Sequence, residues 1–303
     1  MKTLLILAVY FVCYYSYSQH SSVKFIEKHL TEITKTNEFR NYKNVKQLNN
    51  TAAYISSEFK KYSNKVSYQE FNVEENSYKN IICSFGTDDK ERIIIGAHYD
   101  VCGNQQGADD NASGVVGLLE LARLLKNQKL KCRIDLVAFT LEEPPFFRTN
   151  NMGSYIHAKS LKENNTPVKG MISLEMIGYF SDEPYSQNYP ILNMDKIYGN
   201  KGDFITLVNK SNKGIFAKKF CDQFVEEATI KTVVFDNTAS LESVEFSDHL
   251  NYWNFGFDAL MITDTSFLRN KNYHRKSDTL ETLNLPKMAK VIDSVFETLI
   301  TMK

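Results

Sequence analysis

A run of three isoleucines that leads into a polar loop most constrains the fold of this chain. The run, Ile93 to Ile95, lies in the segment 92–97, which is typical of a strand buried on both faces of a sheet. After a Gly-rich loop, apolar residues recur at the i, i+3, i+4, i+7 spacing of a helix that packs on a sheet. These residues are Val115, Leu118, Leu119, Ala122 and Leu125. A strand, a loop and a helix in this order predict a parallel sheet covered by helices.

Apolar strands and amphipathic helices alternate along the rest of the chain. Strands are expected at 66–73, 78–85, 133–140, 170–177, 203–208 and 258–263. Helices are expected at 23–36, 45–62, 151–161, 214–228 and 285–301; the segment 181–201 is a polar, Tyr-rich insertion and 232–243 is irregular. The prediction is a single α/β domain over residues 19–303 with an N-terminal helical lead-in. Its three layers comprise a mostly parallel mixed sheet flanked by helices on both faces.

Composition bears on both the core and the partners. Hydrophobic residues make up 43% of the chain, which is enough for a sizeable core. The 303 residues include 36 basic and 36 acidic side chains, so the formal net charge is zero. A neutral chain gives no reason to expect nucleic acid or an anionic membrane as a partner.

The first 18 residues predict export. Lys2 is followed by an apolar stretch from Leu4 to Cys13, which is short for a membrane-spanning helix. Small residues then precede Gln19, as a signal peptidase requires, so residues 1–18 are predicted to be a signal peptide cleaved after Ser18. The alternative is an uncleaved anchor. We expect a secreted or periplasmic protein with no stable membrane association once the signal is removed.

Four cysteines follow the predicted signal peptide: Cys83, Cys102, Cys132 and Cys221. An oxidising compartment permits disulfides, but the sequence does not pair these residues, and buried thiols are the alternative for those in predicted strands. Because the chain has no C-x-x-C motif, a thiolate zinc site is not expected.

Polar residues follow the predicted strands and suggest a metal site. His98 and Asp100 come directly after the segment 92–97. Imidazole and carboxylate are zinc ligands, and ligands in open α/β sheets bind beyond the carboxyl ends of the strands. Two positions apart in an extended segment, the side chains share a face, so Asp100 could accept the second N–H of His98. The alternative is a solvated pair.

Acidic residues follow two further strands. Glu142 and Glu143 close the apolar segment 133–140, where two carboxylates are costly to bury without a positive partner. One could bind a metal while the other faces a metal-bound water; the alternative is a solvated loop. Glu175 lies within an apolar strand and must be paired, protonated or metal-bound. His274 follows the last strand, and in isolation it is typical of a surface histidine.

Taken together, these motifs resemble a known family. The order H-x-D, D-D-N-x-S-G, E-E, D/E-M-x-G and Y-H-x-x-x-D is similar to that of the secreted zinc-dependent aminopeptidases. Their family also includes the catalytic domain of glutamate carboxypeptidase and, more distantly, glutaminyl cyclase. The resemblance runs from about Tyr78 to the C-terminus. Each motif alone is weak, but five in the same order are specific.

The resemblance implies two zinc ions and five protein ligands. His98 and Glu175 would bind one ion, Glu143 and His274 would bind the other, and Asp110 would bridge both.

The resemblance also implies roles for neighbouring residues. Glu142 matches the general base of the family, and Asp100 matches the partner of the histidine ligand. The peptide bond between Asp110 and Asn111 is expected to be cis.

The chain departs from the family pattern at two points. Glu175 stands where aspartate is usual, which leaves the number of zinc ions open. The segment 144–148 replaces a Gly-containing turn and leaves the substrate preference open. In the motif Ser247-Asp248-His249, and at Asp278, the acidic residues are expected either to support the ligands or to cap local structure.

The expected function is hydrolysis of peptides at a free N-terminus, with Tyr179 or Tyr252 as a candidate second donor to the oxyanion. The alternatives are a glutaminyl cyclase with one zinc, a carboxypeptidase, and a binding module without activity. A serine hydrolase is not indicated, because the chain lacks a G-x-S-x-G motif.

Overall fold

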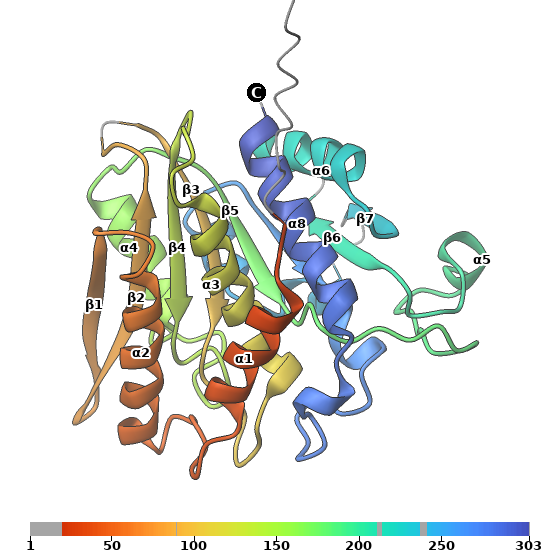
Figure 1. Cartoon of the computed structure of the whole chain (residues 1–303), viewed down its shortest axis with the longest axis horizontal. Helices are drawn as coiled ribbons and strands as arrows, with labels where there is room; N and C mark the ends of the chain where they lie inside the picture. Colours follow the sequence, from red (N-terminus) through yellow and green to blue (C-terminus); the bar gives the residue numbers. More distant parts are fainter. Residues whose placement is uncertain (1–19, 89, 211–213, 237–240, 303) are drawn as a thin grey trace, which may run out of the picture.

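The sheet of this protein has eight strands and is mixed. The computed structural model describes residues 20–88, 90–210, 214–236 and 241–302, so the predicted signal peptide lies outside the described residues. The strand order is β1-β2-β4-β3-β5-β8-β6-β7 (Figure 1). The strands are β1 Val66–Val73, β2 Asn76–Phe85, β3 Arg92–His98, β4 Arg133–Phe139, β5 Val168–Glu175, β6 Ile205–Asn209, β7 Thr232–Asp236 and β8 Ala259–Thr263.

Parallel pairing dominates the middle of the sheet. Neighbouring strands are parallel from β4 through β3 and β5 to β8, and β6 is parallel to β7. The pairs β1–β2, β2–β4 and β6–β8 are antiparallel. The predicted mostly parallel mixed sheet is therefore confirmed, and its four central parallel strands end at one edge.

Helices cover both faces of the sheet. The helices are α1 Val23–Thr34, α2 Val45–Phe59, α3 Gly114–Leu125, α4 Gly153–Glu163, α5 Asp195–Tyr198, α6 Ile215–Glu227, α7 His249–Asn254 and α8 Leu285–Thr301. The larger core joins α1, α2, α3, α6 and α8 to one face of the sheet (Figure 1). A smaller core joins α4 and α7 to the other face. Within the described residues, no helix is both long enough and apolar enough to span a bilayer.

Side-chain caps explain where several helices begin. The Ser22 hydroxyl accepts a hydrogen bond from the backbone N–H of Phe25 at the start of α1. The carboxamide oxygens of Asn44 and Asn284 do the same at α2 and α8, and Pro286 stands in the first turn of α8. These residues satisfy N–H groups that lack partners within a helix.

One part of the predicted secondary structure is wrong. Residues 232–243 were expected to be irregular, but Thr232–Asp236 forms the edge strand β7. The strand has only five residues and buries only Val233 fully, so its alternation is too short to stand out in the sequence. Regular structure in 181–201 is limited to the short helix α5.

Candidate metal centre

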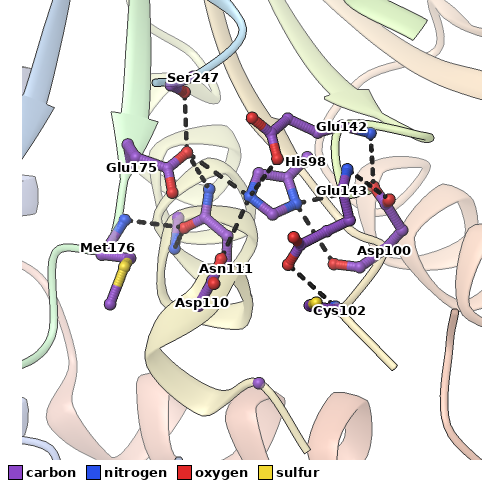
Figure 2. A network of polar contacts seen from close by, with 12 residues as sticks. His98, Asp100, Cys102, Asp110, Asn111, Glu142, Glu143, Glu175, Met176 and Ser247 are labelled. Atoms are coloured by element: carbon purple, nitrogen blue, oxygen red, sulfur yellow. Dashed lines mark hydrogen bonds and ion pairs between the residues drawn. The ribbon is translucent and has the colours of Figure 1, made fainter. Parts of the chain in front are cut away.

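The structure brings the five predicted metal ligands together at the edge where the central strands end. Figure 2 labels four of them: His98, Asp110, Glu143 and Glu175. His98 and Glu175 are the last residues of the neighbouring strands β3 and β5, and Glu143 follows β4. Asp110 lies in the turn that precedes α3, and His274 lies in the loop after β8. Parallel strands thus place three of the side chains, and two loops add the others.

Asp110 lies between the two histidines. Its Oδ1 is 3.3 Å from Nε2 of His98, and its Oδ2 is 3.2 Å from Nε2 of His274. Glu175 Oε2 is 3.5 Å from His98 Nε2, and Glu143 Oε2 is 3.1 Å from His274 Nε2. One carboxylate therefore faces two separate histidine–glutamate pairs.

These contacts define two groups of possible metal ligands. The His98 group comprises His98, Asp110 and Glu175, and the His274 group comprises His274, Glu143 and Cys102; within each group the ligand atoms lie within 4.8 Å of one another. Among the described residues, His98 Nε2, Asp110 Oδ2 and His274 Nε2 are buried and have no hydrogen-bond partner. Buried polar atoms are nearly always satisfied, so the donor set fits metal ions between these atoms.

The carboxylates at the centre also need positive charge. Burial disfavours protonation of His98, but the carboxylates of Glu175 and Glu142 outweigh it and hold its pKa well above the usual value. Burial, reinforced by nearby carboxylates such as Glu175, also holds the pKa of Glu142 well above its usual range. Burial and the charge of Asp110 raise the pKa of Glu143 to about 7. A bound cation would stabilise the ionised carboxylates.

Asp100 holds the segment that carries the two glutamates. Its carboxylate accepts hydrogen bonds from the backbone N–H groups of Glu142 and Glu143, at 3.2 and 3.1 Å. His98 Nδ1 is 3.2 Å from the backbone carbonyl of Asp100 and 3.6 Å from its carboxylate. Asp100 therefore faces the second nitrogen of His98, as expected, but at hydrogen-bond distance through its carbonyl.

The turn that carries Asp110 is fixed on both sides. The Asn111 side chain donates to the carbonyl of Leu174 at 2.8 Å and accepts from the N–H of Met176 at 3.0 Å. The carboxylate of Asp278 accepts from the N–H of Asp110 at 3.1 Å. The peptide bond between Asp110 and Asn111 is cis, which confirms the prediction. These contacts attach the turn to the end of β5 and to the loop that carries His274.

Three residues at the centre have left-handed backbone conformations. Leu141 precedes Glu142 with φ 59°, Met176 follows Glu175 with φ 52°, and His274 itself has φ 56°. None is glycine, and such conformations cost about 1–3 kcal/mol each, so they persist where the surroundings impose them. Their concentration here indicates that the fold holds these side chains in place at a cost in stability.

The three residues of the motif Ser247-Asp248-His249 have different surroundings. The Ser247 hydroxyl donates to Glu175 Oε2 at 2.8 Å. Asp248 is fully buried, and burial raises the pKa of its carboxyl to about 7. His249 Nε2 instead lies 2.8 Å from the carbonyl of Val244, away from the two metal groups. Ser247 therefore supports a proposed ligand directly.

Sequence reasoning missed Arg40, which lies between α1 and α2 and is 2% exposed. Its guanidinium donates to the carbonyls of Tyr99 and Gly107 at 2.7 Å each and also to that of Gln106. It therefore ties the loop between His98 and Asp110 to the N-terminal helices. Arg40 belongs to no motif, and no pattern in the sequence marks it.

A second missed feature is a buried acidic pair behind Asp110. The Asp109 carboxylate accepts from the Asn270 side chain at 2.7 Å and from the N–H of Gly178 at 3.0 Å. Burial and the nearby carboxylate of Asp264 raise the pKa of Asp109 well above its usual range. Asp264 directly follows β8, and this position at the end of a strand could have marked it in the sequence as a residue near the site.

A cavity of about 240 Å³ adjoins the metal centre. Of the tyrosines considered from sequence, neither lines it: Tyr252 is buried with its hydroxyl 2.6 Å from His157 Nδ1, and Tyr179 is not part of the lining. Tyr273 does line it and stacks on His274 with 3.8 Å between the ring centres. Tyr273 is therefore the tyrosine placed beside the His274 group.

The cysteines of the described residues are all free, including Cys102 in the His274 group. Burial and the carboxylate of Glu143 raise the pKa of Cys102 to about 11.

Solved structures share this fold. LapA aminopeptidase of Legionella pneumophila aligns with a TM-score of 0.70 at 20% identity, over 93% of this chain and 73% of that one. A glutaminyl cyclase of Bacteroides thetaiotaomicron aligns with a TM-score of 0.69 at 17% identity, over 94% of this chain and 100% of that one. At these identities the likeness shows the fold alone.

Sequence relatives extend the comparison. YfbL of Escherichia coli is 42% identical over 293 residues, which cover 94% of this chain and 90% of YfbL. Leucine aminopeptidase 2 of Trichophyton rubrum is 27% identical over 218 residues, which cover 66% of this chain but only 39% of that protein. The model of peptidase family M28 matches residues 80–299, which hold every predicted ligand. The chain therefore belongs to peptidase family M28, a family of zinc-dependent metallopeptidases.

Proposed function

We propose that this protein is an aminopeptidase that removes N-terminal residues from peptides with the help of two zinc ions. The observation that carries the proposal is the position of Asp110, whose two oxygens face His98 and His274 separately, at 3.3 and 3.2 Å. A carboxylate in this position can be shared by two ions. The match to family M28 and the sequence similarity to leucine aminopeptidase 2 of Trichophyton rubrum support the same activity.

The proposed roles follow the two groups. His98, Glu175 and Asp110 would hold one ion, and His274, Glu143 and Asp110 would hold the other. When bound, the ions would polarise the scissile carbonyl and lower the pKa of a bound water.

Glu142 is the proposed general base. Its Oε2 lies 3.7 Å from His98 Nε2, beside both groups, and it lines the cavity. It would accept a proton from the attacking water and pass it to the leaving amine. Asp100, bonded to the N–H groups of Glu142 and Glu143, would keep the two carboxylates on their separate sides.

The cavity supports a preference for bulky apolar N-terminal residues. Its lining includes the aromatic side chains of Phe147, Phe246, Phe267 and Tyr273. Apart from the carboxylates of the centre and His274, the described residues that line it include no acidic or basic side chain. A charged side chain would lose hydration there without gaining a partner.

A glutaminyl cyclase is the second candidate. Cyclases share this fold, and the Bacteroides thetaiotaomicron enzyme is covered over its whole length. Glu175, which stands in place of the usual aspartate, favours this alternative if it weakens one of two ions. The two reactions differ in their products, so one assay separates them.

The test is release of amino acids from short peptides that differ only in the first residue. We expect chelation to abolish release and zinc to restore it, with phenylalanine or leucine preferred over alanine, lysine and glutamate. Cyclisation of an N-terminal glutamine without release of amino acids would favour the cyclase. Bound metal with neither reaction would contradict both, and absence of metal would leave a scaffold without this chemistry.

Export remains a prediction. Because residues 1–18 lie outside the described residues, the proposed cleavage before Gln19 rests on the sequence. N-terminal sequencing of the protein recovered from the medium or the periplasm tests it, and an intact N-terminus would contradict cleavage.

A further inference from the structure

We propose that Cys102 is a fourth protein ligand of the metal ion in the His274 group, bound as a thiolate. This inference rests on the proposed two-metal function. Sγ of Cys102, a carboxylate oxygen of Glu143 and a ring nitrogen of His274 lie within 4.8 Å of one another. Together with Asp110, they would give the second ion one sulfur, one nitrogen and two carboxylate donors.

The backbone fixes Cys102 against Glu143. Its N–H donates to Glu143 Oε1 at 2.9 Å, while Oε2 of the same carboxylate is 3.1 Å from His274 Nε2 (Figure 2 shows Cys102 beside Glu143). The carboxylate therefore lies between the Cys102 backbone and the imidazole. This contact keeps the thiol on the side of the centre where His274 enters.

The loop that carries Cys102 is held from the N-terminal region. On one side, the N–H of Val101 donates to the carbonyl of Arg40 at 3.2 Å. On the other side, the Asn41 side chain donates to the carbonyl of Gly103 at 2.8 Å. Because both neighbours of Cys102 are anchored, the thiol has little freedom to move away from the centre.

Asp110 gives an independent indication that an ion belongs at this place. Its Oδ2 is buried, has no hydrogen-bond partner among the described residues and is 3.2 Å from His274 Nε2. A carboxylate oxygen left without a partner in a residue that is 2% exposed is costly. An ion held by Cys102, Glu143 and His274 would supply the missing partner.

The two ions would then differ in their number of protein ligands. The His98 group offers three protein ligands and leaves a position for water, which is the pattern of catalytic zinc. The His274 group would offer four, one more than is usual for a catalytic zinc, which can expand to five ligands when substrate or water binds. Thiolate is a soft ligand that favours zinc over magnesium or calcium. The proposal departs from the expectation, drawn from the absence of a C-x-x-C motif, that no thiolate binds zinc, because here one cysteine joins ligands from other parts of the chain.

Binding is a proton exchange without oxidation. The Cys102 S–H bond breaks, its proton goes to solvent, and a sulfur–metal bond forms. The chain should therefore release one more proton on loading the second ion than a variant without the thiol.

Cobalt(II) tests the proposal, because a thiolate ligand adds a sulfur-to-cobalt charge-transfer band in the near ultraviolet. The full chain, freed of metal and titrated with cobalt, should show the band with the ion of the His274 group. Cys102→Ser should lose the band and one released proton, and should hold that ion at least ~10-fold more weakly. Cys132→Ser, which alters another half-buried cysteine far from the centre, should keep the band and the affinity.

Alkylation provides a measurement on the unmutated chain. At a pH high enough to ionise the free thiol, iodoacetamide should modify Cys102 at least ~10-fold faster in the metal-free protein than after zinc is added, because a coordinated thiolate is a poor nucleophile. Equal rates would overturn the proposal even if Cys102→Ser failed to fold.

The outcomes separate this inference from the proposed function. Two bound cobalt ions and peptide hydrolysis, with the same spectrum in the wild type and in Cys102→Ser, would overturn the sulfur ligand and leave the aminopeptidase intact. Failure of the wild type to bind cobalt would overturn both. A band that disappears in Cys102→Ser but persists in Cys132→Ser would support the ligand.

Discussion

The two halves of the metal centre are built from different parts of the fold. His98 and Glu175 are terminal residues of adjacent strands and are 0% and 6% exposed. His274 and Cys102 lie in loops, and the His274 side chain is 27% exposed. Asp110 belongs to both halves because it has one oxygen toward each histidine.

The two groups of ligands therefore differ in how they are held: pairing within the sheet fixes the His98 group, and contacts between loops fix the His274 group. His98 and Glu175 cannot move without disrupting the pairing of β3 with β4 and of β5 with β8, so the His98 group has little freedom. The His274 group depends on hydrogen bonds between loops, and it adjoins the cavity through Tyr273. We therefore assign proton transfer to the strand-built half and contact with the substrate side chain to the loop-built half.

Glu142→Gln is expected to have the largest effect. The amide cannot accept a proton, so kcat should fall by about 10²- to 10⁴-fold. Both ions should remain, because Glu142 is not among the proposed ligands. Steady-state hydrolysis and metal analysis by plasma emission measure the two quantities.

The matched control is Glu143→Gln, one residue further along the chain. It should lose the ion of the His274 group, because it changes a proposed ligand. Full activity in Glu142→Gln, or two retained ions in Glu143→Gln, would show that the two glutamates have been assigned to the wrong tasks.

Replacing each histidine by alanine tests the two halves directly. Loss of a partner of a ligand alone costs about 10- to 100-fold in metal affinity, so loss of a ligand should cost more. Each of His98→Ala and His274→Ala should therefore retain one ion after dialysis, and His98→Ala should lose more activity, because Glu142 lies beside His98. Equal activity losses would contradict the division of labour between the halves.

Glu175→Asp restores the residue that is usual in the family. The shorter side chain draws the carboxylate away from Ser247, whose hydroxyl donates at 2.8 Å, and away from His98. We expect the ion of the His98 group to bind about 10-fold more weakly, because supporting contacts of this kind carry about that much affinity. Competition with a fluorescent chelator measures the affinity, and tighter binding would show that the extra methylene is a disadvantage.

Phe246→Ala should have the smallest effect on the centre and act on specificity. Phe246 packs against Phe147 and Phe267 with ring centres 5.7 and 6.1 Å apart, and all three line the cavity. Its removal should lower kcat/KM for an N-terminal phenylalanine relative to alanine by about 10-fold, with metal content unchanged. An unchanged ratio would place the substrate side chain outside this cavity.

The ligands that stand at strand ends were largely predictable from sequence. Apolar strands have a recognisable pattern, and the carboxyl ends of neighbouring parallel strands lie at the same edge of a sheet, so the sequence alone predicts His98, Glu143 and Glu175 at one edge. The fold class followed from the same alternation. The strand β7 escaped because five residues at a sheet edge carry too little periodicity.

The loop-built half depends on contacts between distant parts of the chain, which local patterns do not encode. Arg40 reaches the loop after β3 from between two helices, and Asp109 meets Asp264 from a different loop. Cys102 has no motif that marks it as a ligand. Its position beside Glu143 and His274 distinguishes it from the other three free cysteines of the described residues. Such residues are found from three-dimensional proximity.

The position of Arg40 has a consequence for dissecting this enzyme. The family match begins at residue 80, yet carbonyls of the loop after β3 accept hydrogen bonds from Arg40, which lies well before that boundary. The segment that matches the family is therefore shorter than the segment needed to hold this loop in place. A fragment trimmed to the matched region would lack Arg40, leave those carbonyls without their donor and loosen the cysteine-bearing loop, so any minimal form of the enzyme has to include Arg40.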